Sequence, residues 1–576
     1  MKLSILNFSK ANCKNCYKCL RACPVKAIKI KNEQAEIVED LCIGCGQCLI
    51  ICPQNARQIK SDLQEIKNAI KDKKRVIASL APSYVGAFDM CNVGQMSAAL
   101  KSLGFAYVEE TAIGAEVVAD LYKEYVRGGQ YENLITSCCP SANYLVEKYF
   151  PRLSKYLIPV VSPMLAHGKI LKHLYGMDSY VVFIGPCTAK KIESLNFQHK
   201  GTIDAVLTFE ELSKWLDEEN IILYTLNPQP FDQKSFKRGS AFPLEGGVIS
   251  SFMKDQEEKY EVIKVDGIEQ CMKIFQSMEN GSVERVCVEV NTCRGSCIGG
   301  PGMPKNEKDF YKRQKKIKEY TKNKEDSLRY TNFKIENKIN FSKKFIDRKI
   351  KKQKASEEEI QYILKKIGKY EPTDELNCGG CGYNTCREKA QAVFEGMAEL
   401  NMCLPFMRSK AERLTNVIFE NSPNIIMLID EEMRVKEFNP TAERIFKIKA
   451  DEIKDKPISV ILDENLFLSV KESRKNLIGQ KAFLPEYNVV LLQSILYLEK
   501  QNLLLAIMTN ATSEEKHKKE LKRVKENTIE AAQKVIEKQM RVAQEIASLL
   551  GETTAETKVI LTKLKQIALK ENGDME

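Results

Sequence analysis

Long apolar runs are missing from this chain of 576 residues. No segment approaches the ~18 consecutive apolar residues that a membrane-spanning helix requires. The N-terminal stretch "MKLSILNFSKANCKNC" also holds too short an apolar segment for a secretory signal before cysteine-rich sequence begins. We therefore predict a cytoplasmic protein with no membrane partner.

Histidine is scarce, and its scarcity excludes some kinds of cofactor site. The four histidines of the chain form no ligand cluster, and residues 412–512 contain no His, Cys or Trp. A histidine-ligated haem and a cysteinyl-flavin photocycle would each lack a required residue in that stretch.

Acidic residues are outnumbered in one segment. From Lys305 to Lys354 the chain has 19 Lys and Arg against 7 Asp and Glu, whereas the net charge of the whole chain is +11. This one segment therefore carries the whole positive excess. Such a run is typical of a solvated connector, so we predict a basic helical connector over residues 305–371 and no nucleic-acid partner.

Cysteine, by contrast, is abundant, with 20 residues in the chain. In a reducing compartment this number indicates metal ligation or redox chemistry instead of disulfides. The first part of the chain holds a repeat, "CKNCYKCLRACP" from Cys13 and "CIGCGQCLIICP" from Cys42. Each copy has the C-x2-C-x2-C-x3-C-P spacing of two-cluster ferredoxins, in which the fourth cysteine ligates the other cluster.

We therefore predict a ferredoxin domain with two [4Fe–4S] clusters over residues 1–60. The ligands of one cluster are Cys13, Cys16, Cys19 and Cys52, and those of the other are Cys42, Cys45, Cys48 and Cys23. Zinc is the alternative, although structural zinc sites usually separate two C-x2-C pairs by a longer loop.

From about Lys74 short apolar strands alternate with helical stretches, which predicts an α/β domain with a largely parallel sheet over residues 61–304. Three of the strands end in cysteine, at Cys138 and Cys139, at Cys187 and at Cys293. Ligands of open α/β sheets bind beyond the carboxyl ends of the strands, so these distant cysteines could converge on one site.

The loops "TSCCP", "GPCTAKKIE" and "NTCRGSCIGG", in this order behind the ferredoxin repeat, resemble those of the [FeFe]-hydrogenases over residues 10–305. The resemblance implies an H-cluster, which is a [4Fe–4S] cubane bridged to a di-iron unit with CO, cyanide and azadithiolate. It also implies maturation proteins that deliver the di-iron unit. The implied cubane ligands are Cys139, Cys187, Cys293 and Cys297.

The same resemblance assigns roles to other residues. It makes Cys138 the proton-relay thiol and Lys190 a hydrogen-bond donor to a cyanide, and it aligns Glu193 and Glu116 with proton-path glutamates. The implied reaction is the reversible heterolytic splitting of H2, with protons and a ferredoxin-like protein as partners. The residues that would contact the cofactor are Pro82, Ser83, Ser162 and Met164.

The chain departs from the catalytic members of the family at several of these positions. It has Gly185 and Asn291 where they carry methionine, Met164 where they carry glutamine, and "TCRGSC" for "ACPGGC". Ile113 takes the place of a further proton-path glutamate. An incomplete proton chain and altered cofactor contacts predict a hydrogenase of low activity.

A third cysteine module follows the connector. We expect residues 372–410 to form a small domain with one [4Fe–4S] cluster, and a zinc knuckle is the alternative. With the ferredoxin clusters and the H-cluster, this makes three [4Fe–4S] clusters and one H-cluster in the chain. The expected ligands of the third module are Cys378, Cys381, Cys386 and Cys403.

Residues 411–512 resemble a PAS domain through "NSPNIIMLID" and "EFNPTAERIF". The last section, residues 513–576, reads as a polar helix with an apolar seam, which predicts a coiled coil, a homodimer and an output role. The fold class we expect is thus a multidomain α/β and α+β protein with ferredoxin, H-cluster, small [4Fe–4S] and PAS domains and a C-terminal coiled-coil helix.

This order of parts favours the sensory, PAS-containing branch of the [FeFe]-hydrogenases. Its signalling partner, a phosphatase or kinase, would be a separate protein. One alternative is a catalytic ferredoxin-dependent hydrogenase. The second alternative is an iron–sulfur structural or assembly protein that never receives the di-iron unit.

Overall fold

The structure is a computed structural model that describes residues 6–8, 12–253, 259–305, 309–326, 339–350, 353–550, 559–560 and 562–563. The chain divides into two compact units, Met1–Phe406 and Met407–Glu576, which are described separately. Among the described residues, no helix combines the length and the apolar character needed to cross a bilayer.

The cysteine repeats of the first unit lie around two short helices. Each helix begins near the second or third cysteine of its repeat, because a left-handed residue, Tyr17 or Gly46, turns the chain into it. The strands pair as two antiparallel ribbons. The elements are β1 (Leu6–Phe8) with β4 (Arg57–Ile59), β2 (Ile28–Lys31) with β3 (Gln34–Ile37), α1 (Lys18–Ala22) and α2 (Gln47–Ile50).

The middle of this unit is an α/β domain, as predicted, but its parallel strands are divided between two sheets. One central strand of each sheet is buried along its whole length, β5 (Val76–Leu80) in one and β11 (Val286–Asn291) in the other. The four-stranded sheet has the order β6 (Tyr107–Glu110), β5 (Val76–Leu80), β8 (Tyr180–Gly185), β9 (Ala205–Thr208). The three-stranded sheet has the order β10 (Glu261–Asp266), β11 (Val286–Asn291), β7 (Leu134–Ile135).

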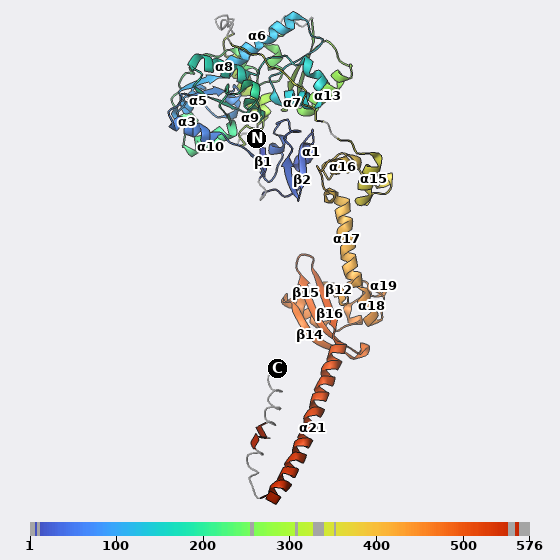
Figure 1. Cartoon of the computed structure of the whole chain (residues 1–576). Coiled ribbons are helices and arrows are strands. Elements are labelled where there is room, and N and C mark those ends of the chain that lie inside the picture. The colour runs from blue at the N-terminus through green and yellow to red at the C-terminus, as the bar shows by residue number, and fades with distance from the viewer. Residues whose placement is uncertain are drawn as a thin grey trace. The chain divides into compact units, whose positions relative to one another are not determined.

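Helices α6 and α8 pack against each other (Figure 1), and α8 also packs on β5 and β8 of the four-stranded sheet. Four of the helices, α6, α7, α10 and α13, begin just beyond a strand, as the alternating pattern predicted, whereas α5 and α8 do not. The helices are α3 (Leu63–Lys71), α4 (Tyr84–Ala87), α5 (Gly94–Ser102), α6 (Ala112–Gly128), α7 (Pro140–Tyr149), α8 (Pro163–Tyr175), α9 (Ala189–Ser194), α10 (Phe209–Glu218), α11 (Lys237–Ser240), α12 (Gly247–Ser250) and α13 (Ile268–Glu279).

The basic connector packs on the α/β domain instead of standing in solvent. Its first helix, α14 (Phe310–Lys322), lies on α4 and buries Ile317 completely. Residues 339–350 then run extended, with Ser342 bridged to Val160 and the Lys343 amide donating to the Pro159 carbonyl at 3.1 Å. This extended course corrects the expectation of a helical connector, because backbone pairing with the domain replaces helical hydrogen bonds there.

The third cysteine module also belongs to the first unit. Its helices α15 (Glu357–Lys366) and α16 (Cys386–Phe394) bury an apolar seam between them. The module shares a hydrophobic core with the ferredoxin repeat, through Tyr383 and Met397 beside Leu20 and Ile30. The Ile30 amide donates to the Met397 carbonyl at 3.0 Å, so the two modules are joined through the backbone as well.

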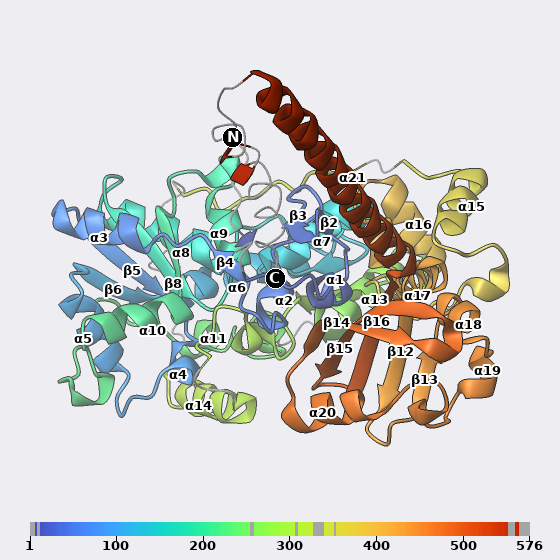
Figure 2. The same cartoon turned by 90° about the horizontal axis from the view of Figure 1, so that it is seen from below.

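The second unit contains a five-stranded antiparallel sheet with three helices against it (Figure 2). Two strands, helices and then three strands follow one another, as predicted. The sheet order is β13 (Val435–Phe438), β12 (Ile425–Asp430), β16 (Leu503–Asn510), β15 (Val489–Leu498), β14 (Leu477–Leu484). The helices are α18 (Pro440–Phe446), α19 (Ala450–Ile453) and α20 (Asn465–Ser473), with α17 (Leu404–Asn421) before the sheet and α21 (Thr512–Leu550) after it.

Helix α21 carries the expected apolar seam in exposed positions. Leu521 is 73% exposed, and Val524, Val535, Val542 and Ile546 are exposed as well. A second chain that covered this seam would bury it, so the homodimer stays a prediction.

Candidate functional site

Three loops meet where the two parallel sheets point their carboxyl ends at each other. Cys138 and Cys139 follow β7, Cys187 follows β8, and Cys293 and Cys297 follow β11. All five cysteines line one cavity of about 110 Å³, which we call the cysteine cavity. Four other predicted site residues line it too: Pro82, Ser83, Met164 and Lys190.

The adjacent cysteines hold their side chains against different partners. Cys139 has extended backbone (φ −90°, ψ 108°) directly before the proline that starts α7, and extended backbone points successive side chains to opposite sides. The Cys138 sulfur lies 3.3 Å from the hydroxyl of Tyr122, and the Cys139 sulfur lies 3.6 Å from Oγ1 of Thr292. One thiol can therefore hold a cluster while the other faces a different part of the cavity.

The thiol of Cys138 is held in its protonated form. Burial raises its pKa to about 12, although the Tyr122 hydroxyl and the Lys190 ammonium both act to lower it. Burial also raises the pKa of Cys187 to about 11 and raises the pKa values of Cys293 and Cys297. The three thiols of Cys187, Cys293 and Cys297 cannot all ionise in one cavity unless a positively charged metal centre replaces their protons.

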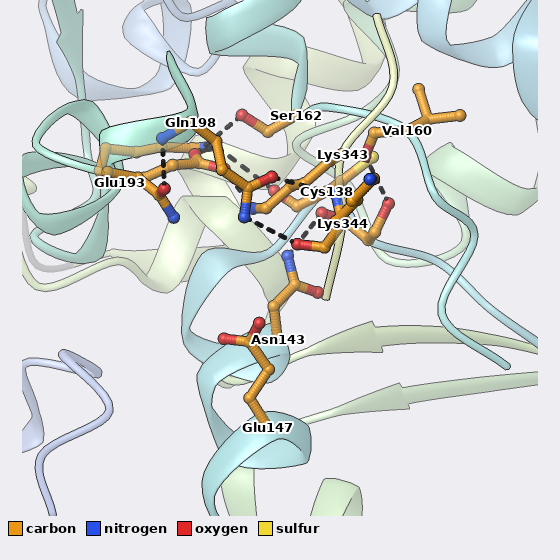
Figure 3. A network of polar contacts seen from close by, with 12 residues as sticks. Cys138, Asn143, Glu147, Val160, Ser162, Glu193, Gln198, Lys343 and Lys344 are labelled. Carbon is orange, nitrogen blue, oxygen red and sulfur yellow. Dashed lines mark hydrogen bonds and ion pairs between the residues drawn. The ribbon is translucent and has the colours of Figure 1, made fainter. Parts of the chain in front are cut away.

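A buried ion-pair network lies behind the cavity wall (Figure 3). The carboxylate of Glu193 accepts hydrogen bonds from Lys190 at 2.7 Å, Ser162 at 2.8 Å and Lys343 at 3.1 Å. Lys343 comes from the extended part of the connector, so a segment remote in sequence completes this network. Burial would raise the pKa of Glu193, but the two lysines outweigh burial and hold the pKa at about 2.

The two predicted proton-path glutamates do not line the cysteine cavity. Glu193 is bound by Lys190 and Lys343, as described, and Ser162 points its hydroxyl at Glu193 instead of into the cavity. Glu116 accepts from Nε of Arg238 at 2.8 Å and from the Gly239 amide at 2.6 Å. Lysines, an arginine and a backbone amide bind these two carboxylates. Among the described residues, no continuous chain of hydroxyl or carboxyl groups connects either carboxylate to Cys138.

Two residues that line the cysteine cavity, Phe183 and Ser141, were not predicted from the sequence. Phe183 lines the cavity, and a Cβ at Gly185 would lie 2.7 Å from its ring. Phe183 thus fills the space beside Gly185, where the catalytic relatives were expected to carry a methionine. The hydroxyls of Ser83 and Ser141 are buried in the same wall without a hydrogen-bond partner among the described residues, and only the side-chain directions reveal this.

A further carboxylate lies close to the cavity wall. Glu289 accepts from the amides of Gly246 and Ile249 at 3.0 and 2.8 Å, and Nδ2 of Asn291, a cavity residue, donates to it at 3.1 Å. Burial raises the pKa of Glu289 to about 7, although the two amides act in the opposite direction.

This raised pKa predicts a pH-dependent stability. The folded state keeps the proton on Glu289 more firmly than the unfolded state, so its contribution to stability is full below about pH 4.5 and falls as the pH rises to about 7. The expected loss is about 3 kcal/mol. Denaturant unfolding at pH 5 and pH 7.5 measures it, and Glu289→Gln should remove most of the difference. An equal pH difference in this variant would contradict the assignment.

The ferredoxin repeat adjoins the cysteine cavity directly. Cys45 and Gly44 line the cavity, and Oγ1 of Thr188 donates to the Gly44 carbonyl at 2.9 Å. A Cβ at Gly46 would lie 2.5 Å from the ring of Pro301, and Gly46 has a φ of +72°. Only glycine permits this turn and this close approach.

The thiols predicted to ligate one of the two ferredoxin clusters, those of Cys23, Cys42, Cys45 and Cys48, are close enough to affect one another's ionisation. The pKa of Cys45 is raised first by burial and then by the neighbouring thiols of Cys23, Cys48 and Cys42. Each repeat contains the same local hydrogen bond to its fourth cysteine. The Ala27 amide donates to the Cys23 sulfur, and the Ala56 amide donates to the Cys52 sulfur, both at 3.3 Å. Such donors are typical of cluster ligands, whose sulfurs carry negative charge.

The third module gathers its four cysteines around a smaller cavity of about 20 Å³, lined by Cys378, Cys381, Cys386 and Cys403. Lys389 lies in the same wall, almost fully buried, and donates to the Leu400 carbonyl at 3.0 Å. A buried ammonium beside four thiols balances the negative charge of a cluster that they would hold.

Family models match every cysteine module of the chain. A 4Fe–4S dicluster domain matches residues 5–65, an Fe–S cluster domain matches residues 374–405, and a PAS domain matches residues 412–480. The iron only hydrogenase large subunit, C-terminal domain, matches residues 74–301. Residues 74–301 are therefore similar to the C-terminal domain of the large subunit of iron only hydrogenases. Most of the residues that line the cysteine cavity lie in this part of the chain.

Two curated hydrogenases are similar to this chain over about half of its length. Iron hydrogenase 1 of Clostridium pasteurianum is 28% identical over 53% of this chain and 66% of its own length. The large subunit of the periplasmic [Fe] hydrogenase of Nitratidesulfovibrio vulgaris is 29% identical over 53% of this chain and 87% of its own length. The chain spans less than two thirds of the first of these relatives.

A different class of protein is also similar. The cytosolic Fe–S cluster assembly factor NAR1 of Encephalitozoon cuniculi is 23% identical over 34% of this chain and 58% of its own length. Among solved structures, an apo [FeFe]-hydrogenase of Chlamydomonas reinhardtii is 18% identical and covers 50% of this chain and 100% of its own, with a TM-score of 0.43.

Proposed function

We propose that this chain is a sensory [FeFe]-hydrogenase, which splits H2 reversibly at modest rate and passes the electrons to a PAS-linked output. The observation that carries the proposal is the shared cavity of the four ligand cysteines with Cys138 and Lys190. A bare cubane needs only four thiolates. A free thiol and a buried ammonium in the same wall are the groups that an additional anionic, proton-handling unit needs.

The residues of the cavity fit an H-cluster in two further ways. The hydroxyls of Ser83 and Ser141 are buried in the wall without a partner among the described residues, so they are free to donate to a polar ligand there. The rest of the wall is largely apolar, with Phe183, Phe242 and Val248. Such a wall excludes water and strengthens the few polar contacts.

When bound, the H-cluster supplies the heterolytic cleavage of H2. The chain contributes Cys138, whose thiol gives and takes a proton beside the reacting atoms without ionising in the resting protein. Lys190 keeps its charge because Glu193, itself fixed by Lys343, offsets the cost of burying the ammonium. Cys139, Cys187, Cys293 and Cys297 would hold the cubane.

Electrons leave the site through the ferredoxin clusters. Cys45 forms part of the cavity wall, and its neighbours Gly44 and Gly46 press against the loops that carry Cys187 and Cys297. The cluster held by Cys45 would therefore be the first electron acceptor.

The third module is in position to receive these electrons. Nζ of Lys26 donates to the Gly382 carbonyl at 2.8 Å, and Nη1 of Arg21 donates to the Gly380 carbonyl at 3.0 Å. Both carbonyls lie in the loop that joins Cys378, Cys381 and Cys386. Helix α17 begins directly after Cys403, and the PAS domain follows it in the chain. A redox change at this module would therefore occur at the start of the sensory part.

Gly382 offers a test of this junction. It has a φ of +94°, and a Cβ there would lie 2.9 Å from the side chain of Leu20 on α1. We expect Gly382→Ala to loosen the junction by about 2 kcal/mol, partly from backbone strain and partly from the clash. The reduction of the third cluster under H2, followed by electron paramagnetic resonance after rapid freezing, should become slower.

Gly396→Ala is the matched control. Gly396 also has a positive φ, of +68°, but no atom lies within 4 Å of the position of a Cβ. The Gly396→Ala substitution therefore introduces backbone strain without a steric clash. Equal reduction kinetics in the two variants would show that the contact with α1 does not govern electron transfer.

Infrared spectroscopy tests the proposed function as a whole. After maturation the full chain should show the stretching bands of CO and cyanide, and H2 should alter these bands. H2 should then also change the amide hydrogen exchange of α21, as a switch with a redox input and a helical output requires. Bands that respond to H2 with no change at α21 would support the catalytic alternative.

A second candidate function is iron–sulfur cluster assembly. It is favoured by the similarity to NAR1 and by the departures from the catalytic pattern at Gly185, Ile113 and Asn291. Under this reading the matured chain would contain cubanes but no CO or cyanide bands.

A further inference from the structure

A line of buried polar side chains leads from the cysteine cavity to the outer edge of the four-stranded sheet. Thr111, which lines the cavity, has its Oγ1 2.8 Å from Oγ of Ser79, and this Oγ is 2.8 Å from Nδ1 of His167. Nε2 of His167 lies 3.1 Å from Oε2 of Glu109. The Tyr175 hydroxyl donates to Oε1 of the same carboxylate at 2.6 Å. We call these five residues the Thr111–Tyr175 chain.

The fold places these residues together through strand register and a close helix contact. Ser79 on β5 pairs with Glu109 on β6, so the two side chains leave the sheet side by side. Helix α8 brings His167 down over both. A Cβ at Gly114 on α6 would lie 2.4 Å from the Pro163 carbonyl and 2.7 Å from the His167 Cβ, so α8 can come this close only because residue 114 is glycine.

Burying these polar side chains costs free energy, which indicates that they are there for a function and not for stability. Ser79, Glu109 and His167 are completely buried, and Thr111 is nearly so. Apolar side chains of similar size would stabilise a sheet–helix contact at least as well as a buried histidine–carboxylate pair. The groups are instead satisfied one after another, without a gap, between a cavity and the half-buried Tyr175.

Each member can both release and accept a proton. Hydroxyl groups do so at one oxygen, imidazole does so through its two nitrogens, and a carboxylate becomes a donor once it is protonated. Burial raises the pKa of Tyr175, and its bond to Glu109 raises this pKa further, so the phenol stays protonated at rest. The other groups that face Tyr175 are the ring of Tyr107, at a centroid distance of 4.2 Å, and Asp232. The guanidinium of Arg75 donates to the Tyr175 carbonyl.

We propose that the Thr111–Tyr175 chain is a proton conduit between the cysteine cavity and the surface. The inference rests on the proposed function, because it is the reaction with H2 that releases protons in the cavity. The expected proton path through glutamates is interrupted, because residue 113 is isoleucine and because Glu116 and Glu193 are held in ion pairs. The Thr111–Tyr175 chain offers a different path for the same protons.

Protons and charge balance along the conduit. For outward transfer, Thr111 accepts a proton from the cavity and gives its hydroxyl proton to Ser79, and Ser79 gives its own to Nδ1 of His167. His167 releases the proton on Nε2 to the Glu109 carboxylate. Tyr175 then gives its phenolic proton to solvent and takes the one from Glu109, so one proton has crossed and every group has regained its charge. The uptake of protons reverses these steps.

Proton exchange at His167 can be measured without the di-iron unit. With only four histidines in the chain, labelling histidine with nitrogen-15 gives a spectrum in which the His167 ring protons can be assigned. We expect Tyr175→Phe to slow their exchange with deuterium oxide about tenfold, a barrier increase of about 1.4 kcal/mol. Tyr180→Phe is the control, because Tyr180 is the first residue of β8 in the same sheet and is not part of the Thr111–Tyr175 chain.

Two variants test the conduit in the matured protein. His167→Phe keeps the shape of the ring but removes both nitrogens, and Ser79→Ala removes one link. We expect each to lower H2 uptake about 100-fold, as the loss of a positioned proton carrier does, with the CO and cyanide bands of the resting protein unchanged. Ser97→Ala, at a buried serine outside the chain, should keep the uptake of the parent protein.

The outcomes separate the conduit from the proposed function. Unchanged deuterium exchange in Tyr175→Phe, or full uptake in Ser79→Ala, would overturn the conduit. Exchange that depends on Tyr175, in a protein that never shows CO and cyanide bands, would support the conduit as a path into the cavity and overturn the hydrogenase function.

Discussion

Replacement of Cys138 by alanine is expected to abolish most H2 turnover while the metal centres remain in place. Cys138 is the cavity thiol without a ligand role once Cys139, Cys187, Cys293 and Cys297 are assigned to the cubane and Cys45 to a ferredoxin cluster. Loss of a positioned proton carrier lowers rates by about 10²- to 10⁴-fold. The measurement is H2 uptake with an artificial electron acceptor, together with the infrared bands of CO and cyanide.

Cys287→Ala is the matched control for this variant. Cys287 is completely buried in the hydrophobic core and does not line the cysteine cavity. Its replacement should lower stability somewhat and leave the turnover of each folded molecule unchanged. Turnover in Cys138→Ala equal to that of the control would remove the proton-relay role from Cys138.

Loss of the third cluster is expected to disconnect H2 from the output helix. In the double variant Cys378→Ala and Cys381→Ala, two of the four cysteines of the smaller cavity are missing, so the chain should contain about four iron atoms fewer. H2 should still reduce the H-cluster and the ferredoxin clusters, because these lie upstream. The change in the hydrogen exchange of α21 under H2 should vanish.

The control for this experiment is Cys91→Ser with Cys271→Ser. Cys91 is exposed, Cys271 is a buried residue of α13, and neither lines a cysteine cavity in the described part of the chain. This variant should keep its iron and its response. A response of α21 that persists without the third cluster would mean that the signal reaches the output by another route.

Both experiments depend on assignments that were made from spacing. The doubled C-x2-C-x2-C-x3-C-P repeat predicted the ferredoxin module, and a dicluster family model matches it. The parallel α/β character of the middle domain and the order of strands and helices in the PAS domain were also predictable. Local patterns suffice there, because the period of apolar residues reflects which face of each element is buried.

Other features depend on segments that are distant in sequence. In the sequence, Lys343 is one of many lysines in a basic segment, with nothing to set it apart. In the structure, its ammonium donates a hydrogen bond to Glu193 within a buried network. Glu116 and Glu193 had been expected on the proton path, yet Arg238 and two lysines engage them. The sequence does not show whether a glutamate is free or in an ion pair. Its function depends on neighbouring side chains that are brought to it only by folding.

The sequence alone determined which sulfurs are available, since ligand spacing is a local property of the chain. It also determined the order of the modules from ferredoxin to output helix. Only the tertiary structure decided that two separate sheets meet at one cavity, that the third module rests on the ferredoxin repeat, and that Ser79, Glu109 and His167 form a line to Tyr175. The physical reason is that strand register and the packing of helices fix the positions of side chains that are far apart in sequence, and no local pattern contains those distances.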